Sequence, residues 1–177
     1  KSTGGERMSE AYDSVPGESA QAPEQGQLRI EKLFLKDASF ESPLSPKVFT
    51  VQQQPRISVE INTRAQSLEQ DLHEVVLTAQ VTAKVEEDTK VAFVCEIQQA
   101  GIFKLQGFDA PRLSQVIGIA CPNVLFPFLR ENVDALVVKG GFPPLQLAPI
   151  NFEALYFEAV REQQRQAAEG DHGTIPH

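Results

Sequence analysis

Residues 73–98 read HEVVLTAQVTAKVEEDTKVAFVCEIQ, and this stretch decides the fold. Apolar and polar side chains alternate over residues 73–85, which is typical of a β-strand that buries one face. This run would span roughly 43 Å at 3.3 Å per residue. A short turn at 86–89 leads into a second alternating run, whose apolar phase is Val91, Phe93, Cys95 and Ile97. Strands joined this tightly form an antiparallel hairpin, and their length predicts that the sheet continues into, or packs against, another subunit.

The chain before this hairpin predicts two further strands. Residues 28–31 alternate, and the apolar run 33–35 then interrupts the phase, which indicates a β-bulge or a strand buried on both faces. Three prolines make residues 42–55 a long crossover without regular structure. Renewed alternation over residues 57–62 marks a short second strand.

Helical spacing takes over after Asp109. Apolar side chains follow the i, i+3, i+4, i+7 pattern of an amphipathic helix, starting at Leu113. Pro122 and Pro127 are expected to kink or restart this helix. The pair Gly140-Gly141 is expected to end it, because glycine is favoured just after a helix C-terminus.

A last helix is predicted after a second proline-rich loop. Asn151 is a suitable N-cap, and one stripe of the helix would carry Phe152, Leu155, Tyr156 and Ala159. The sequence turns polar after Arg161, where the helix is expected to fray. Strands followed by helices predict an α+β fold, a four-stranded antiparallel sheet with helices packed on one face.

Composition divides the chain into an ordered centre and two polar ends. Residues 1–27 are rich in Ser, Gly, Pro, Gln and acid, so a disordered arm is expected there. Residues 1–7 precede the single methionine, Met8, and are interpreted as a remnant of an expression vector. One domain is expected over residues 28–160, followed by a polar, flexible tail at 161–177.

Charge and hydropathy argue against two classes of partner. The 177 residues carry 16 Lys and Arg against 24 Asp and Glu, which gives a formal net charge of −8. Nucleic-acid binding needs clustered cations that this chain lacks. No apolar run approaches the roughly 18–20 residues of a membrane span, so a cytoplasmic protein without direct membrane insertion is expected.

Motifs for catalysis and cofactor binding are missing. Neither common glycine-rich phosphate loop occurs. A Cys95 nucleophile with His73 as its base is disfavoured, because Cys95 lies on the apolar phase of its strand and burial raises a thiol pKa. The three histidines are too scattered to form a zinc site with Cys95 and Cys121, which are expected to be buried free thiols. We therefore expect no catalytic residues, no metal and no cofactor.

The distribution of aromatic residues has two interpretations. Eight of the eleven phenylalanines fall at or after Phe93, and several surround two proline-rich loops. They could simply fill the core. Alternatively, they line an open apolar groove that accepts an extended apolar peptide, because apolar residues on loops often face a ligand or partner.

Three stretches resemble the SecB family of bacterial export chaperones. They are AFVCEIQQAGIF at 92–103, CPNVLFPF at 121–128, and GFP at 141–143 with LAPINF at 147–152. The similarity covers about residues 28–160. It implies an ATP-independent holdase, assembled as a homotetramer that is a dimer of dimers. This holdase would keep precursor proteins unfolded and deliver them to the motor ATPase SecA.

The resemblance also implies which residues contact partners. SecA contacts map to Asp37, Glu41, Val94 and Glu96, and the strand phases independently place Asp37 with Glu41, and Val94 with Glu96, on the more polar faces. In SecB-like proteins this surface receives a basic, zinc-bearing C-terminal segment of the motor, so any zinc would belong to the partner. Charge complementarity would make that binding fast and sensitive to salt.

Two further sets of residues follow from the resemblance. One set matches a family segment tied to substrate binding and subunit assembly: Phe93, Cys95, Ile97 and Gln99. These residues are expected on a strand edge that faces another subunit. Alternatively, they serve only the core. The other set would line the client groove: Phe126, Phe128, Phe142, Leu145, Phe152 and Tyr156. Family crossovers often carry a tryptophan before the second strand, whereas this chain has glutamines at 52–54, which weakens the case for an aromatic wall from the crossover.

Two rival functions stay open at this point. A small-ligand binding protein or hydrolase would need a closed pocket, and a hydrolase would also need polar catalytic residues that the sequence does not offer. A SecB-like chaperone could instead guard a toxin–antitoxin pair without delivery to a motor. The acids Asp37, Glu41 and Glu96 argue against that second alternative.

Overall fold

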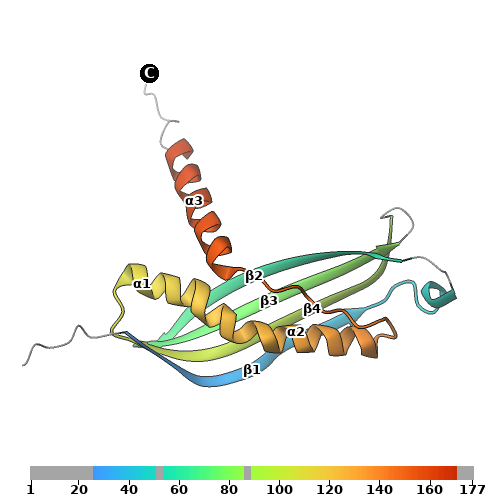
Figure 1. Ribbon diagram of the computed structural model, residues 1–177, viewed down its shortest axis with the longest axis horizontal. Coiled ribbons are helices and arrows are strands. Elements are labelled where there is room, and N and C mark those ends of the chain that lie inside the picture. The colour runs from blue at the N-terminus through green and yellow to red at the C-terminus, as the bar shows by residue number, and fades with distance from the viewer. Residues whose placement is uncertain (1–25, 51–53, 86–88, 171–177) are drawn as a thin grey trace, which may run out of the picture.

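The computed structural model describes residues 26–50, 54–85 and 89–170 and shows a long sheet with a helical run along one face (Figure 1). Its strands β1 (Gln27–Glu41), β2 (Arg56–Glu69), β3 (Leu72–Val85) and β4 (Lys90–Gln106) form one four-stranded sheet in the order β1-β4-β3-β2. All three strand pairs are antiparallel. The predicted α+β fold is confirmed.

The predicted antiparallel hairpin of β3 and β4 is confirmed. From Ala83, which pairs with Phe93, through Ala79, which pairs with Ile97, the alternating residues of both strands fall on common faces. Nearer the turn the register shifts between Ala83 and Lys84, and Val85 pairs with Lys90. The alternation recognised in the sequence ends near Ile97, but β4 continues to Gln106 because β1 and β3 pair with it on both sides. β4 is therefore an interior strand.

The first two strands differ in how well the sequence predicted them. β1 is irregular where expected, with register shifts between Ile30 and Lys32 and between Leu35 and Asp37. β2 is not the short strand that was expected, since it has 14 residues. Its polar second half pairs with β3 as far as Glu69, and backbone pairing does not require apolar side chains.

The crossover between β1 and β2 contains one regular element, contrary to expectation. A short 3₁₀ helix, η1 (Lys47–Thr50), forms between the prolines, and the Thr50 hydroxyl donates a 2.8 Å hydrogen bond to the Lys47 carbonyl. Four residues are enough for one turn of a 3₁₀ helix, because its hydrogen bonds join residues only three apart in the sequence. The glutamines at 52 and 53 and the turn residues 86–88 lie outside the described residues.

The helical run over residues 110–139 is continuous. Asp109 caps α1 (Ala110–Gln115) by accepting a 2.9 Å bond from the Arg112 amide. A π-helical segment η2 (Val116–Ala120) follows, and α2 (Cys121–Lys139) ends at Gly140, as predicted. An α-helix restarts with Pro122 in its first turn, after the π-helical segment, which is one of the outcomes expected there, whereas Pro127 does not interrupt α2. Pro122 has no N–H for the Gly118 carbonyl, and the turn just before it widens to the π form while Pro127 lies inside α2.

One stripe of α2 builds the core against β3 and β4. Its buried members recur every four residues, at Cys121, Leu125, Leu129, Val133 and Val137. They face the buried side chains of β3 and β4, in a cluster that includes Leu77, Val81 and Ile97. This spacing keeps one helix face on the sheet for the whole length of α2.

The helical run also corrects an expectation about hydropathy. By length and composition alone, Ala110–Lys139 could cross a membrane, with a mean hydropathy of 1.3 over its most apolar window. The core helix of a soluble protein passes the same test, and the inner stripe of α2 does pack on the sheet. Most of the window is nevertheless unburied within the single chain.

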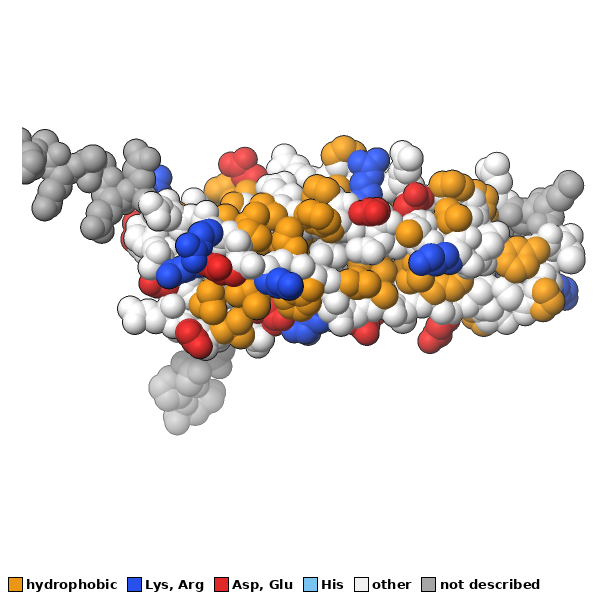
Figure 2. Space-filling model, turned by 90° about the horizontal axis from the view of Figure 1, so that it is seen from below, with side chains coloured by type: hydrophobic (Ala, Val, Ile, Leu, Met, Phe, Trp, Pro, Cys, Tyr) orange, Lys and Arg blue, Asp and Glu red, His pale blue; other side chains and the backbone are white. Residues whose placement is uncertain are grey.

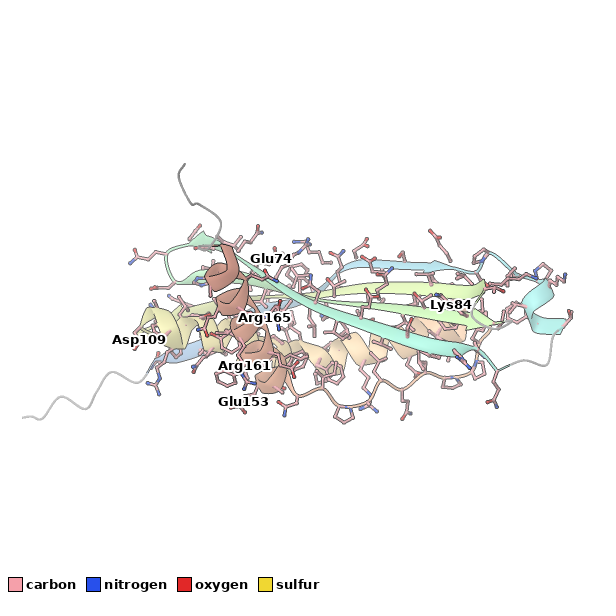
Figure 3. The ribbon with its side chains drawn as sticks, turned by 90° about the horizontal axis from the view of Figure 1, so that it is seen from above. Glu74, Lys84, Asp109, Glu153, Arg161 and Arg165 are labelled. Atoms are coloured by element: carbon pink, nitrogen blue, oxygen red, sulfur yellow. The ribbon has the colours of Figure 1, made fainter. Side chains whose placement is uncertain are left out.

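The last helix, α3 (Phe152–Gly170), begins as predicted but ends later. Asn151 caps it by accepting a 3.0 Å bond from the Ala154 amide. The helix continues to Gly170, whereas fraying was expected after Arg161. Its second half points away from the sheet, and an ion pair between Arg165 and Glu162 with an N–O distance of 2.6 Å lies along it (Figures 1 and 3).

Both cysteines are buried free thiols, as predicted. Burial raises the pKa of Cys95 to about 11 and that of Cys121 to about 12, from an ordinary value of 9.0. The folded chain should therefore resist alkylation at neutral pH, while the denatured chain reacts at both sites. Mass spectrometry after iodoacetamide treatment checks this.

The same pKa shifts predict alkaline destabilisation. A raised folded-state pKa favours the native state fully below pH 9, where unfolded thiols are still protonated. That contribution should be lost as the pH rises from about 9 towards the folded values of about 11 and 12. Urea unfolding across this range measures it. A variant with Cys95→Ala and Cys121→Ala should lose less stability over the same range, and an unchanged slope would contradict the prediction.

Candidate functional site

The two faces of the sheet differ in burial and in polarity. The helix face carries Leu77, Val81, Cys95 and Ile97, which are buried under α2. We call the opposite side the open face. It carries the alternate residues of each strand, which are mostly polar and partly or fully exposed.

The four predicted SecA-contact positions lie together on the open face. β1 pairs with β4 so that Glu41 is opposite Val94, Ser39 opposite Glu96, and Asp37 opposite Gln98. Glu96 is therefore the diagonal neighbour of both Asp37 and Glu41, a spacing of about 7–8 Å between backbone positions. We call Asp37, Glu41, Val94 and Glu96 the acidic patch. Among the described residues, no three His, Cys, Asp or Glu side chains are grouped to hold a metal ion.

Three residues extend this surface and were missed in the sequence. Glu60 on β2 is opposite Gln80, which is opposite Glu96, so a further carboxylate lies in the same cross-strand row. Gln98 donates a 3.1 Å bond to Glu96, and Arg64 donates a 3.1 Å bond to Gln98. The strand phase of Glu60 could have indicated it, but the Arg64 contact depends on the order of the strands.

The positions assigned to assembly and substrate binding lie beneath α2. Phe93, Cys95, Ile97 and Gln99 are all on the helix face of β4 and are at most 3% exposed. The expected location on a strand edge is wrong, because β4 is interior. The Gln99 amide is bonded within the protein, since it donates to the Phe34 carbonyl at 3.0 Å and accepts from Asn132 at 3.1 Å. Any role of these side chains outside the core stays a prediction.

Four aromatic rings gather where α2 ends. Phe142 lies 4.6 Å from Phe93, 5.2 Å from Phe49 and 6.1 Å from Phe40, between ring centroids. We call these four residues the aromatic cluster. Phe93 is 2% exposed, whereas Phe49, on η1 of the crossover, is 51% exposed. The crossover thus supplies an aromatic side chain through Phe49, although it lacks the family tryptophan.

An apolar groove of about 390 Å³ lies near the start of α3, on the helix side of β2. We call it the α3 groove. Tyr156 lies against Gly118 of the π-helical segment, and its hydroxyl is 3.0 Å from the Ser114 hydroxyl. Phe152 is buried and packs edge-on against Phe126 at 5.8 Å. The lining residues are Ile61, Asn62, Thr63, Ala65, Ser114, Ile117, Gly118, Phe152, Leu155, Tyr156 and Ala159.

The predicted groove residues therefore divide between two places. Phe142 belongs to the aromatic cluster, and the Leu145 amide nearby donates a 2.8 Å bond to Asp134 of α2. Phe152 and Tyr156 line the α3 groove, with Phe126 behind Phe152. Phe128 is 42% exposed on α2 and makes no ring contact with the other described aromatics.

The contact between α3 and the helical run predicts the effect of adding one methyl group. A Cβ at Gly118 would lie 2.5 Å from the Tyr156 ring. Gly118→Ala should therefore displace α3 and cost about 1–3 kcal/mol of unfolding free energy. Tyr156→Ala should relieve the clash, so the double variant should be less destabilised than the sum of the single ones. Urea unfolding measures all three, and strictly additive losses would contradict this contact.

The fold and its surfaces define the class of the protein as α+β, with an acidic patch on one face of a sheet and an apolar groove on the other side. The family model described as preprotein translocase subunit SecB matches residues 20–164. That match begins and ends outside the domain expected at residues 28–160. The chain belongs to the SecB family of protein-export chaperones.

Several relatives have similar lengths and high identity. The chain is 47% identical over 151 residues to a protein-export protein SecB of Hahella chejuensis, covering 85% of this chain and 94% of that one. It is 43% identical over 168 residues to a protein-export protein SecB of Pseudomonas fluorescens, covering 95% and 99%.

A solved structure shares the fold. It is a Mycobacterium tuberculosis SecB-like chaperone in complex with a peptide from an antitoxin, with a TM-score of 0.59 and 16% identity. The alignment covers 70% of this chain and 90% of that one.

Proposed function

We propose that this protein is an ATP-independent holdase of the bacterial cytoplasm, which binds unfolded precursor proteins and delivers them to SecA. Membership in the family of export chaperones supports protein transport as the setting. The observation that supports the holdase function is that large apolar side chains on the helices and on the crossover are exposed to solvent. These exposed residues include Phe49, Phe128, Leu155 and Phe157.

The aromatic cluster and the α3 groove are the proposed client sites. Burial of apolar surface is non-directional and contributes about 25 cal/mol per Å², so such sites bind many apolar segments with little sequence specificity. An unfolded chain that occupies both sites gains from effective concentration, and weak local contacts then add to firm binding. Proteins that fold quickly bury their apolar segments before capture.

The acidic patch is the proposed docking site for SecA. Its three carboxylates lie on the neighbouring strands β1 and β4, and Val94, opposite Glu41, adds a small apolar surface at one end of the patch. A basic, zinc-bearing segment of the motor matches this surface in charge, and the zinc belongs to the motor. Complementary charge speeds encounter and fixes orientation. Clients and motor would then occupy opposite faces of one sheet.

A homotetramer, built as a dimer of dimers, is the proposed assembly. Ile30 and Leu35 on the edge strand β1 are exposed in the single chain, and much of the apolar run at residues 110–139 is unburied. Apolar patches are spread along the molecule when it is seen from below the view of Figure 1 (Figure 2). Contiguous exposed apolar patches often mark protein–protein interfaces.

The antitoxin complex of the M. tuberculosis chaperone raises one alternative, control of a toxin–antitoxin pair without motor delivery. The export-chaperone relatives are far more similar in sequence than that structure is. The presence of all four acidic-patch residues also favours motor delivery. A small-ligand binding protein gains no support, because the α3 groove is open and apolar.

Light scattering on the purified chain tests the holdase proposal. The chain is measured alone and with a reduced, slow-folding precursor diluted from denaturant, without ATP. A mass near four subunits that shifts to a soluble complex is the expected result. A scrambled client of equal apolar content should bind as well as the original. A monomer that leaves the precursor to aggregate would overturn both the assembly and the function.

A further inference from the structure

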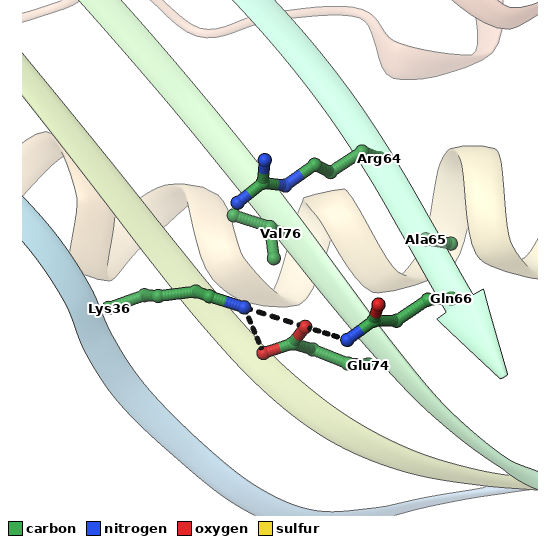
Figure 4. A pocket seen from close by; sticks show the side chains of 6 residues that line it. All are labelled: Lys36, Arg64, Ala65, Gln66, Glu74 and Val76. Carbon is green, nitrogen blue, oxygen red and sulfur yellow. Dashed lines mark hydrogen bonds and ion pairs between the residues drawn. The ribbon is translucent and has the colours of Figure 1, made fainter. Parts of the chain in front are cut away.

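The open face carries a second concave site, next to the acidic patch. It is a depression of about 250 Å³ lined by residues of three strands, and we call it the Arg64 pocket. Val76 on β3 is 1% exposed and lies under the Arg64 guanidinium, which extends over it (Figure 4). The complete lining is Lys36 of β1, Arg64, Ala65 and Gln66 of β2, and Glu74 and Val76 of β3.

The one carboxylate in the pocket lining, that of Glu74, is ion-paired with a lysine of the same pocket. Lys36 Nζ lies 2.7 Å from both carboxylate oxygens of Glu74, and Gln66 donates a further 2.7 Å bond to Oε2 (Figure 4). Glu74 is nearly buried, so its charge needs this partner. Both carboxylate oxygens have partners within the pocket. Because Lys36 and Glu74 carry opposite charges, the pair contributes no net charge to the site.

Arg64 leaves the pocket with a surplus positive charge. Its guanidinium donates one bond, to the neutral Gln98 amide oxygen at 3.1 Å, and forms no ion pair with any residue in the described part of the chain. A guanidinium has five N–H donors in a fork that matches a carboxylate. The pocket therefore offers donors and one uncompensated cation above an apolar floor.

We propose that the Arg64 pocket binds the carboxylate of one acidic side chain in the same basic segment that docks on the acidic patch. This inference rests on the proposed function of that patch. Gln98 connects the two sites, because it accepts from Arg64 and donates to Glu96, each at 3.1 Å. A segment that lies across both sites meets negative charge on one side of Gln98 and positive charge on the other.

The neighbouring acids select against other anions. A nucleic acid or an anionic lipid surface would bring many negative charges against Asp37, Glu41 and Glu96, on a chain with a net charge of −8. A single carboxylate flanked by basic residues avoids this repulsion. Arg64 would thereby set the register and direction of the bound segment, which the acidic patch alone does not define.

Synthetic peptides test the pairing. A lysine-rich peptide is compared with a series in which one glutamate moves along it residue by residue, using fluorescence anisotropy on the full chain. One glutamate position should bind about 3–10-fold more tightly than its neighbours, as expected for one charge-assisted pair. Arg64→Gln should abolish this preference, while Arg56→Gln, at the other end of β2, should keep it. If glutamate weakens binding at every position, the inference is overturned.

A second measurement does not depend on the docking proposal. Sodium acetate is titrated against the full chain, and the side-chain Nε–H NMR signals of Arg64 and Arg56 are followed, with sodium chloride as the control. Arg64 should show a saturable shift that Arg56 lacks, and equal shifts would overturn the inference. If the all-lysine peptide fails to bind, the docking function of the patch is wrong, and the acetate titration still decides the pocket.

Discussion

Reversing two charges of the acidic patch is expected to weaken binding of the basic, zinc-bearing motor segment by about 100-fold. In a variant with Asp37→Lys and Glu96→Lys, two attractive contacts become repulsive on neighbouring strands. The fold should survive, because Asp37 is exposed and Glu96 is half-buried on the open face. Fluorescence anisotropy with the labelled segment measures the affinity. The loss should shrink at high salt, since exposed charges are screened beyond about 10 Å at 0.1 M.

A matched control separates the patch from the total charge. Glu153→Lys with Glu158→Lys changes the net charge by the same amount but places the new lysines on α3, which carries no residue of the acidic patch and near whose start Glu153 lies (Figure 3). This control should bind the segment with nearly unchanged affinity. If it loses as much affinity as the patch variant, the segment responds to overall charge and the patch is not its docking site.

The second large effect concerns the aromatic cluster. Phe93→Ala should cost about 3–5 kcal/mol of unfolding free energy, because it removes a buried ring and leaves a cavity beneath Phe40 and Phe142. Phe49→Ala should cost less than about 1 kcal/mol, because half of that ring is already exposed. Urea unfolding compares the two variants.

The client assay should rank the same variants in the opposite sense. Under conditions where both are folded, Phe49→Ala should weaken capture of an unfolded precursor several-fold, because it removes the accessible ring of the cluster. Phe93→Ala should affect capture only through stability. A Phe49→Ala protein that captures clients normally would remove the cluster from the client site. Equal destabilisation by both variants would instead place Phe49 in the core.

The elements that could be predicted from the sequence are those in which apolar side chains recur with the period of a buried face. The alternation over residues 73–85 is visible because one face of β3 packs under α2, and the phase of Cys95 predicted its burial for the same reason. The second half of β2 gave no such signal, because its ladder is made by backbone groups under polar side chains. The extension of α3 to Gly170 was missed because polar sequence was equated with fraying, although Glu, Gln, Arg and Ala favour helix.

The candidate site was predictable in part. Strand phase placed Asp37, Glu41 and Glu96 on polar faces, but phase does not say which strands are neighbours. Only the order β1-β4-β3-β2 brings these acids into one patch and lets Arg64 of β2 reach across β3 to Gln98 of β4. Likewise, the groove residues were chosen because they are aromatic or aliphatic, and the sequence did not indicate that they divide between two places.

The pleat of β4 has a consequence for how this chain tolerates change. Alternate residues of that strand hold α2 on one side and present the acidic patch on the other, so each position serves one of the two surfaces. A single inserted residue within 93–99 would transpose the two sets, directing Glu96 into the core and a phenylalanine or isoleucine into water. Substitutions in this strand can be graded in their effects, whereas a one-residue insertion or deletion should disrupt the hydrophobic core and the proposed motor-docking site together.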